Sequence, residues 1–150
     1  MATILLVDDD DVARLVVRRM IERDGHEVVE AADGQAALDR LQLGLRPDCI
    51  ILDLMMPELG GVDVLKRLRG DARWSNIPVI LMTALNEGRE VDEARAIGFR
   101  RHFVKAYWHM GDLLRTIGRA TAEGGAQTHP IDQDRVATGA ECSQLTHSAR

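Results

Sequence analysis

The sequence predicts one α/β domain in which a parallel sheet carries helices on both faces. Five short runs of apolar and β-branched residues predict strands at 3–7, 27–31, 49–52, 77–82 and 101–104. A stretch with helical spacing of apolar residues follows each run. Strands that alternate with helices are joined by right-handed crossovers, so the sheet is parallel and covered on both sides. A chain of 150 residues is long enough to bury such a core.

An acidic run separates the first predicted strand from the first predicted helix. Asp10 or Asp11 is expected to cap this helix, because a carboxylate accepts hydrogen bonds from the free N–H groups of the first turn. We expect the buried face of the helix to contain Val12, Leu15, Val16 and Met20. Asp33 is expected to cap the second helix in the same way.

The second half of the domain repeats the pattern. The strand 49–52 is apolar throughout, which suits burial on both faces, and it ends at Asp53. The strand 77–82 precedes a helix that is expected to begin at Asn86 and to end at Gly98. The buried faces of the last three helices are expected to contain Val62, Leu65, Leu68, Val91, Ala94, Ile97, Met110, Leu113, Leu114 and Ile117.

Composition excludes several classes of function. A formal net charge of −5 argues against nonspecific nucleic-acid binding and against a membrane-surface role. The two cysteines, Cys49 and Cys142, are far apart in the sequence, so we do not expect a disulfide framework. This cysteine content fits the reducing environment of the cytoplasm. We expect no signal peptide, because the first residues lack a basic region and a cleavage site, and no apolar run approaches the length needed to cross a bilayer. We therefore expect a cytoplasmic protein.

Polar side chains follow four of the predicted strands. Asp8 and Asp9 follow the first, Asp53 the third, Thr83 the fourth and Lys105 the fifth. Because ligands bind at the carboxyl ends of strands in open α/β sheets, we expect these side chains to meet. Three carboxylates in one crevice would repel one another without a cation, and hard oxygen ligands suit Mg²⁺.

The remaining groups of this edge suggest phosphoryl transfer to a carboxylate. Lys105 brings a compact positive charge, Thr83 a hydroxyl and Ala84 a backbone N–H. Such transfer depends mainly on positioning and on neutralising charge. Each residue alone is better explained by an ordinary structural role, as a cap, a strand-end hydroxyl or a solvated lysine. Their placement at the ends of neighbouring strands favours function.

Four motifs resemble the receiver domain of two-component response regulators. They are VDDDD at 7–11, ILDLMMP at 51–57, MTA at 82–84 and VK at 104–105. The resemblance covers residues 3 to about 121 and implies a flavodoxin-like (βα)5 three-layer sandwich with strand order 2-1-3-4-5. We therefore expect a receiver domain at 1–121. A polar tail at 122–150 is expected to be disordered and to contain no effector domain.

The resemblance also implies the role of each site residue. Asp53 would accept a phosphoryl group from a histidine kinase or a phosphotransfer protein. Asp8, Asp9, Asp53 and the backbone carbonyl of Met55 would hold Mg²⁺. Thr83, Ala84 and Lys105 would contact the phosphoryl group, and Thr83 and His102 would form the switch that signals phosphorylation.

Several residues depart from the usual receiver pattern. Ala106 replaces the proline that normally follows the lysine, which puts a cis peptide in doubt. His102 replaces the usual aromatic switch residue, and Gly60 replaces a common Asp or Asn. Met55 and Leu85 are apolar where polar groups tend to assist the attacking water, which predicts slow autodephosphorylation.

We expect a stand-alone signalling protein rather than an enzyme with a separate substrate. The stretch after the last helix is too short for an effector domain, so output is expected through protein contacts. The expected surface is the fourth helix, fifth strand and fifth helix, including Arg100, Arg101, His102 and Tyr107. The protein is expected to be a monomer or a phosphorylation-dependent dimer, with neither nucleic acid nor membrane as a partner.

Four alternatives remain open from the sequence. The first is an intermediate phosphorelay carrier. An aspartate-dependent phosphohydrolase uses similar residues, but its nucleophile normally follows the first strand, so phosphate on Asp8 would indicate that enzyme. A flavin-binding electron carrier shares the topology, although the acidic run after the first strand would repel the flavin phosphate. A degenerate receiver used only for docking conflicts with the presence of all five site residues.

Overall fold

The computed structural model describes residues 1–122 and 136–137, and the strands within these residues form one parallel sheet. The sheet order is β2-β1-β3-β4-β5-β6. The predicted order 2-1-3-4-5 is therefore confirmed, with β6 added beside β5. The strands are β1 (Thr3–Val7), β2 (Glu27–Ala31), β3 (Cys49–Leu52), β4 (Val79–Thr83), β5 (Arg101–Val104) and β6 (Val136–Ala137).

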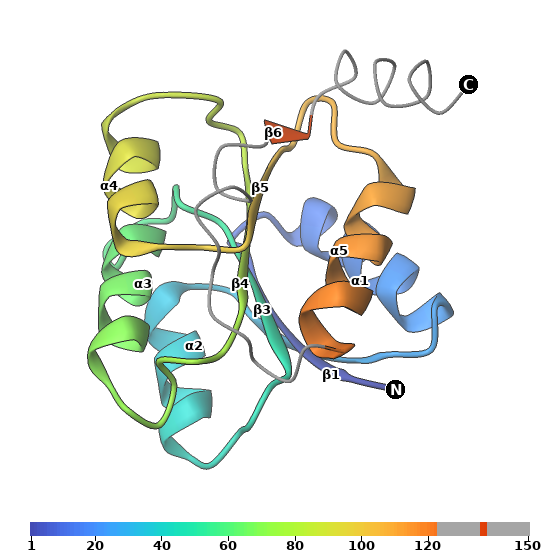
Figure 1. The fold of residues 1–150 in the computed structure, drawn as a ribbon, viewed down its shortest axis with the longest axis horizontal. Coiled ribbons are helices and arrows are strands. Elements are labelled where there is room, and N and C mark those ends of the chain that lie inside the picture. The colour runs from blue at the N-terminus through green and yellow to red at the C-terminus, as the bar shows by residue number, and fades with distance from the viewer. Residues whose placement is uncertain (123–135, 138–150) are drawn as a thin grey trace.

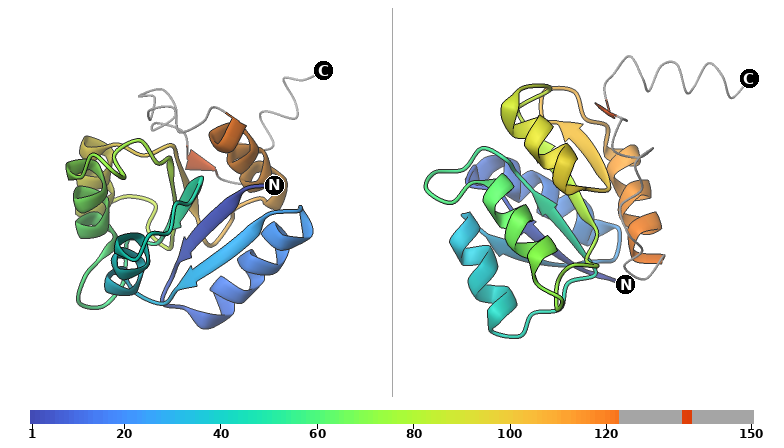
Figure 2. Two further views of the ribbon diagram at one scale, coloured as in Figure 1. Left: turned by 90° about the horizontal axis from the view of Figure 1, so that it is seen from below. Right: turned by 60° about the vertical axis from the view of Figure 1, so that its left-hand side comes forward.

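Helices cover both faces of the sheet and give three layers. Figure 1 shows α2, α3 and α4 on one side of the strands and α1 and α5 on the other, and Figure 2 shows the same layers from two further directions. The helices are α1 (Asp11–Arg23), α2 (Gly34–Gln42), α3 (Gly61–Gly70), α4 (Arg89–Ile97) and α5 (Met110–Ala122). Among the described residues, no helix is both long and apolar enough to cross a membrane.

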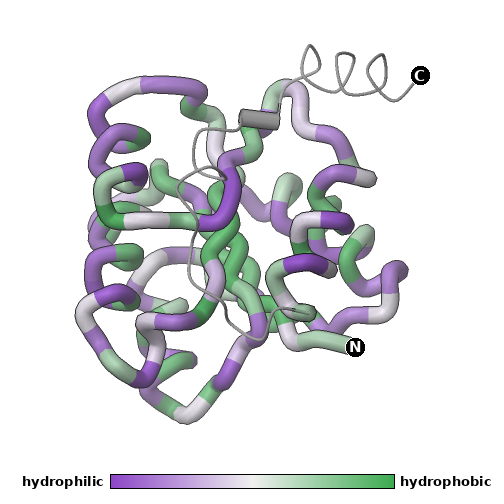
Figure 3. The backbone as a smooth tube through the Cα atoms, in the orientation of Figure 1, coloured by the Kyte–Doolittle hydropathy of each residue, from purple (hydrophilic) through white to green (hydrophobic). Residues whose placement is uncertain are grey.

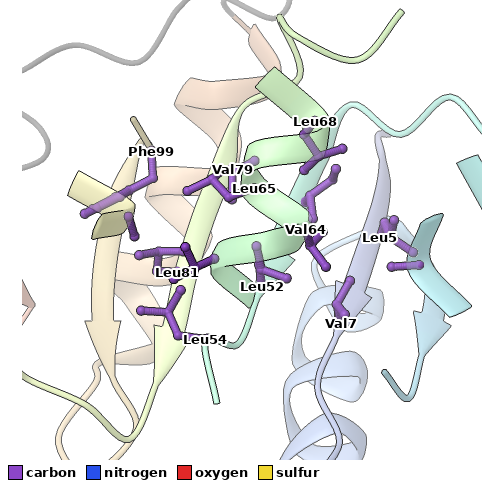
Figure 4. Packing of buried hydrophobic residues seen from close by; sticks show 14 of the residues in the cluster. Leu5, Val7, Leu52, Leu54, Val64, Leu65, Leu68, Val79, Leu81 and Phe99 are labelled. Atoms are coloured by element: carbon purple, nitrogen blue, oxygen red, sulfur yellow. The ribbon is translucent and has the colours of Figure 1, made fainter. Parts of the chain in front are cut away.

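Each buried strand sends alternate side chains into two separate cores. In β1, Leu5 and Val7 point toward α2, α3 and α4, whereas Ile4 and Leu6 point toward α1 and α5. The residues of the central strands are accordingly mostly hydrophobic, as the hydropathy colouring of the backbone in Figure 3 shows. Figure 4 shows the first core, which includes Leu52, Leu54, Val64, Leu65, Leu68, Val79, Leu81 and Phe99.

Helix α1 buries a different face from the one predicted. Val17 and Ile21 are its buried residues, while Val12 is 72% exposed and Val16 is 47% exposed. Apolar residues occur on two sides of this helix, so apolar spacing alone did not identify the inner one. The sequence prediction of its buried face was wrong, and the helix presents an apolar surface to solvent.

Two boundaries also differ from the prediction. β4 begins at Val79 rather than at residue 77, since Pro78 has no N–H to donate to a neighbouring strand. The Pro78 carbonyl still accepts a hydrogen bond from Ile50. α4 begins at Arg89 rather than at residue 86, because Gly88 precedes it with φ at +127°, far from helical geometry.

Gly61 lets the start of α3 pack directly against the end of β3. Its N–H donates a 3.0 Å hydrogen bond to the Leu54 carbonyl. A Cβ atom at this position would overlap the backbone carbonyl of Asp53 and the Cα of Leu54. The first turn of α3 can therefore approach Asp53 only because residue 61 has no side chain.

The predicted tail at 122–150 falls largely outside the described residues. Ala122 ends α5, and Val136–Ala137 form β6, which the sequence analysis did not predict. The apolar pair is too short to produce a recognisable strand pattern.

Candidate functional site

The strand register brings four of the predicted site residues to one edge of the sheet. Val7 of β1 pairs with Leu52 of β3, so the next residues, Asp8 and Asp53, are neighbours. Thr83 of β4 pairs with Val104 of β5, and Lys105 follows immediately. The backbone continues this pairing past the strands. The Asp53 N–H donates to the Val7 carbonyl at 3.0 Å, and the Lys105 N–H donates to the Thr83 carbonyl at 2.8 Å.

Three carboxylates meet at this edge. Each of Asp8, Asp9 and Asp53 offers an oxygen atom, and these atoms lie within 4.8 Å of one another. Asp8 and Asp53 are each only 4% exposed, whereas Asp9 is exposed. Hard oxygen donors at this spacing, with one open side, fit a divalent cation that keeps part of its water shell.

Lys105 bridges the two buried carboxylates. Its Nζ lies 2.8 Å from Asp8 Oδ2 and 3.0 Å from Asp53 Oδ2. The lysine side chain is 21% exposed, so its charge is only partly screened by water. One cation thus balances two buried anions, and Asp9 remains as a further negative charge on the open side.

The pKa directions reflect this shared cation. Burial raises the pKa of Asp53 above its ordinary value, and the hydrogen bond and charge of Lys105 only partly oppose that rise. Burial alone would lower the pKa of Lys105, but its hydrogen bonds and charge interactions with Asp8 and Asp53 outweigh burial and raise it. Lys105 interacts with both carboxylates, while Asp53 receives only part of one positive charge. A second cation at this edge would therefore be stabilising.

Backbone N–H groups fix the two buried carboxylates. Asp53 Oδ1 accepts a hydrogen bond from Met55 N at 3.1 Å, and Asp8 Oδ1 accepts one from Asp10 N at 2.9 Å. Each side chain thus binds the loop that follows its strand through one oxygen and Lys105 through the other. The Met55 side chain is 48% exposed beside the site.

The acidic run divides between the site and the helix. Asp10 caps α1, and its Oδ1 accepts hydrogen bonds from Val12 N at 3.0 Å and Ala13 N at 3.1 Å. The hydrogen bond from Ala13 N is the main reason that the pKa of Asp10 lies below its ordinary value. Asp11 forms a 2.6 Å ion pair with Arg14. Asp10 and Asp11 therefore belong to the helix, as the sequence analysis expected.

On the other side of the site, Thr83 connects to His102 through Leu85. Thr83 is fully buried, and its Oγ accepts a long hydrogen bond of 3.5 Å from Leu85 N. The Leu85 carbonyl lies 2.8 Å from Nε2 of His102. The Leu85 side chain packs against the core beneath α3 and α4. The Lys105–Ala106 peptide is trans.

His102 is enclosed rather than exposed. Its ring is fully buried and lies edge-on to Phe99, with ring centres 6.2 Å apart. Burial is the main reason that the pKa of His102 lies below its ordinary value. Arg100 is also buried, so the expectation that both residues lie on an output surface was wrong. Tyr107 is exposed, as expected.

Arg14 and the backbone contact of Leu85 with His102 were not predicted from the sequence. Arg14 donates from one guanidinium nitrogen to the Asp8 carbonyl at 2.6 Å and from another to Glu30 at 3.0 Å. A cation near the N-terminus of a helix opposes the helix dipole, and that unfavourable position was a usable signal of a specific contact. The role of Leu85 depends on its backbone carbonyl, so its side chain gave no signal.

A sheet of order 2-1-3-4-5 with this acidic edge defines a signalling receiver domain. The chain belongs to the response regulator receiver domain family, whose pattern it matches over residues 4–117. Receivers are signalling phosphoacceptors of two-component systems, and the resemblance inferred from the sequence motifs is therefore confirmed.

Relatives of different lengths share this domain. The chain is 35% identical over 104 residues to "Sporulation initiation phosphotransferase F" of Bacillus subtilis, covering 69% of this chain and 82% of that protein. It is 40% identical over 91 residues to "Transcriptional regulatory protein AfsQ1" of Streptomyces coelicolor, covering 61% of this chain but 39% of that protein. The chain thus spans well under half of the second relative.

Solved structures support the same fold. The chemotaxis response regulator CheY4 of Vibrio cholerae superposes with a TM-score of 0.71 at 32% identity, covering 80% of this chain and 98% of that one. A Mn²⁺-bound form of the response regulator Rcp1 superposes with a TM-score of 0.65 at 25% identity, covering 78% and 89%.

Proposed function

We propose that Asp53 accepts a phosphoryl group from the phosphohistidine of a histidine kinase or phosphotransfer protein, and that the chain signals through protein contacts. The observation that carries this proposal is the bridge from Lys105 to Asp8 and Asp53 at the acidic edge. It leaves a buried carboxylate beside both a fixed cation and a set of metal ligands.

The proposed transfer exchanges one phosphorus bond for another. A carboxylate oxygen of Asp53 attacks phosphorus, the P–N bond to the donor imidazole breaks, and an acyl phosphate forms. Lys105 already lies 3.0 Å from Asp53 Oδ2, so it can follow the phosphoryl oxygens without a large movement. Attack by water on phosphorus later breaks the P–O bond to Asp53 and releases phosphate with the carboxylate.

Asp8, Asp9 and Asp53 would hold the divalent cation, with the Met55 carbonyl as a further donor. When bound, Mg²⁺ would supply charge neutralisation for the phosphoryl oxygens. The Mn²⁺-bound form of the similar regulator Rcp1 supports a divalent cation here. The chain's own contribution is to keep both buried carboxylates oriented through the N–H groups of Asp10 and Met55.

The exposed apolar face of α1 supports docking of the phosphodonor close to Asp53. Val12 lies four residues after Asp8, and Val16 is one helical turn further along. Solvent-exposed apolar residues that border a charged site are typical of a protein interface. We propose that this face contacts an apolar helical surface of the donor.

The output surface proposed here lies on α4, β5 and α5, with Arg101 and Tyr107 as its more exposed members. Thr83 and His102 would link it to the phosphoryl group through Leu85. We also propose that the receiver domain spans residues 1–121 and that the protein is cytoplasmic. It would be a monomer or a phosphorylation-dependent dimer.

Phosphate uptake tests the acceptor directly. The full chain is incubated with Mg²⁺ and a small acyl phosphate, and its intact mass is measured. We expect uptake by the parent and by Asp63→Asn, a control at an exposed carboxylate of α3, but no uptake by Asp53→Asn. Equal uptake by Asp53→Asn and the parent would reject Asp53, and phosphate found on Asp8 would favour a phosphohydrolase.

A second assay separates a relay carrier from a terminal regulator. The name of the Bacillus subtilis relative, a phosphotransferase, favours testing onward transfer. Purified phosphorylated chain is mixed with histidine phosphotransfer domains, and the loss of phosphate from Asp53 is followed. Fast transfer to a histidine would identify a relay, whereas retention of phosphate during capture of a downstream protein would identify a terminal regulator.

A further inference from the structure

The two edges of the five-stranded part of the sheet differ in their protection. At one edge, β2 carries Glu27 and Glu30, and Glu30 binds Arg14 at 3.0 Å and Arg18 at 2.6 Å. Charged side chains discourage an edge strand from pairing with another chain. At the other edge, β5 contributes Arg-His-Phe-Val, in which Arg101 is the only Arg, Lys, Asp or Glu residue. The β5 edge therefore has less charge to prevent strand addition.

A short segment of the same chain covers the β5 edge. Val136 and Ala137 of β6 pair in parallel with His102 and Phe103 of β5, and Figure 1 shows β6 beside β5. Parallel neighbours need a connection of a dozen or more residues, usually with a helix. Residues 105–135, which include α5, meet that requirement. The sixth strand therefore follows the same topological rule as the first five.

The covered strand is the one that connects the site to the proposed output surface. His102 pairs with Val136 through its backbone, while its ring contacts the Leu85 carbonyl and Lys105 follows two residues after Phe103. A partner that recognises β5 by adding a strand would have to occupy the backbone groups that β6 uses. β6 and such a partner cannot bind together.

We propose that Val136–Ala137 act as an intramolecular cap on a strand-accepting edge of β5, which an extended segment of a downstream partner displaces. The regulation of this cap rests on the proposed function. Phosphorylation of Asp53 would pull Thr83 toward the phosphoryl group. This movement would shift Leu85 and His102 and loosen the pairing of β5 with β6. The cap itself depends only on the backbone pairing.

Amide hydrogen exchange of the full chain tests the cap. The variant Val136→Pro/Ala137→Pro removes both N–H donors of β6, and Ala140→Pro is the matched control outside it. In peptides that span residues 99–105, we expect β5 amides to exchange about fivefold faster in the double-proline variant than in the parent. This factor corresponds to the loss of about one net hydrogen bond. The control should match the parent. Equal exchange in the parent and the double variant would overturn the proposal.

A peptide with the sequence of residues 131–141 tests whether the edge accepts a strand. Excess peptide should restore slow exchange at β5 in the double-proline variant, whereas a scrambled peptide should not. Failure of both peptides would overturn the strand-accepting part. If slow exchange in the parent required high protein concentration and a dimer by light scattering, a second copy would be the occupant, and the intramolecular cap would be rejected.

Phosphate uptake by the same variants separates this proposal from the proposed function. If the variants take up phosphate normally and the β5 amides exchange equally in parent and double-proline variant, the cap is rejected and the proposed function stands. An exchange difference in a chain that takes up no phosphate at Asp53 would reject the phosphoacceptor function and leave the cap standing. Phosphorylated parent should exchange at β5 nearly as fast as the double-proline variant, and unchanged exchange after uptake would reject the regulatory link.

Discussion

Lys105 and His102 lie three residues apart at the end of β5, yet they hold the two sides of the site in different ways. Lys105 contacts two buried carboxylates at 2.8 and 3.0 Å. His102 has one neutral contact, 2.8 Å to the Leu85 carbonyl, and Leu85 in turn has a long 3.5 Å contact with Thr83. Charge-assisted bonds of the first kind are about twice as strong as neutral bonds of the second.

The difference indicates a division of labour across the site. On the acidic side, a backbone N–H group and Lys105 both hold each of the two buried carboxylates. The Thr83–Leu85–His102 side is held by weak bonds that a phosphoryl group could outcompete. If Asp53 accepts a phosphoryl group as proposed, the strong contacts would preserve the reacting geometry and the weak ones would allow a change of conformation.

The largest expected effect comes from removing the lysine. Lys105→Met should slow phosphate uptake from a small acyl phosphate about hundredfold, since the transition-state oxygens lose a preorganised cation. Lys66→Met is the control, because Lys66 is exposed and, within residues 1–122 and 136–137, its ion pair is a 3.9 Å surface contact with Glu93. Uptake rates come from a time course of intact mass. An uptake rate for Lys105→Met within twofold of the control would show that the Lys105 contacts contribute little to phosphate uptake.

A smaller effect is expected on cation binding. Asp9→Asn should weaken Mg²⁺ binding about tenfold, because it removes an exposed oxygen donor while leaving the Lys105 bridge intact. Asp10→Ala should leave Mg²⁺ binding unchanged but lower the unfolding temperature by a few degrees through loss of the α1 cap. Calorimetric titration and thermal unfolding measure the two effects. Weaker Mg²⁺ binding by Asp10→Ala and unchanged binding by Asp9→Asn would show that the roles of these two aspartates are assigned wrongly.

Phosphate lifetime probes the border between the two sides. Met55→Asn with Leu85→Glu should shorten the lifetime of the acyl phosphate about fivefold, since a polar side chain can orient the attacking water. Met55→Asn alone should account for most of the change, because Met55 is exposed beside Asp53 whereas Leu85 packs against the core. Release of phosphate is followed after removal of the donor. Identical half-lives in parent and double variant would contradict the prediction.

The smallest effect concerns His102. His102→Phe should lower the free energy of unfolding by about 1 kcal/mol at pH 7.5, because the Leu85 carbonyl loses its partner. The folded protein lowers the pKa of His102, so acidification through pH 6.5 protonates the unfolded chain first and costs the parent stability. The gap between parent and variant should therefore shrink at pH 5, as measured by urea denaturation. A larger difference in the free energy of unfolding at pH 5 than at pH 7.5 would contradict the direction of the His102 pKa shift. His109→Gln is the control, because His109 is exposed.

The sequence predicted the sheet and the acidic edge well because both follow from local signals. Apolar runs with a single polar residue after them mark buried parallel strands, and the strand order then places Asp8, Asp53 and Lys105 together. The inner face of α1 could not be predicted in the same way. Val16 and Val17 are equally apolar, and they differ only in that Val17 belongs to the second core whereas Val16 is 47% exposed.

Backbone contacts account for what remained hidden. The Leu85 carbonyl, the Asp8 carbonyl bound by Arg14 and the pairing of Val136 with His102 do not depend on side-chain type. The buried position of Arg100 was likewise missed, since arginine usually lies at the surface. Such features arise when distant segments meet, and residue patterns along the chain carry little information about them.

The close approach at Gly61 limits how this site can vary among sequences. Any side chain there would push α3 away from the Asp53 carbonyl, and the loop carrying Met55 would move with it. Random mutagenesis with selection for signalling should therefore keep glycine at residue 61 and accept many residues at Gly70, where a Cβ would meet no neighbour within 4 Å. The smallest residue near the site would then be among its least replaceable.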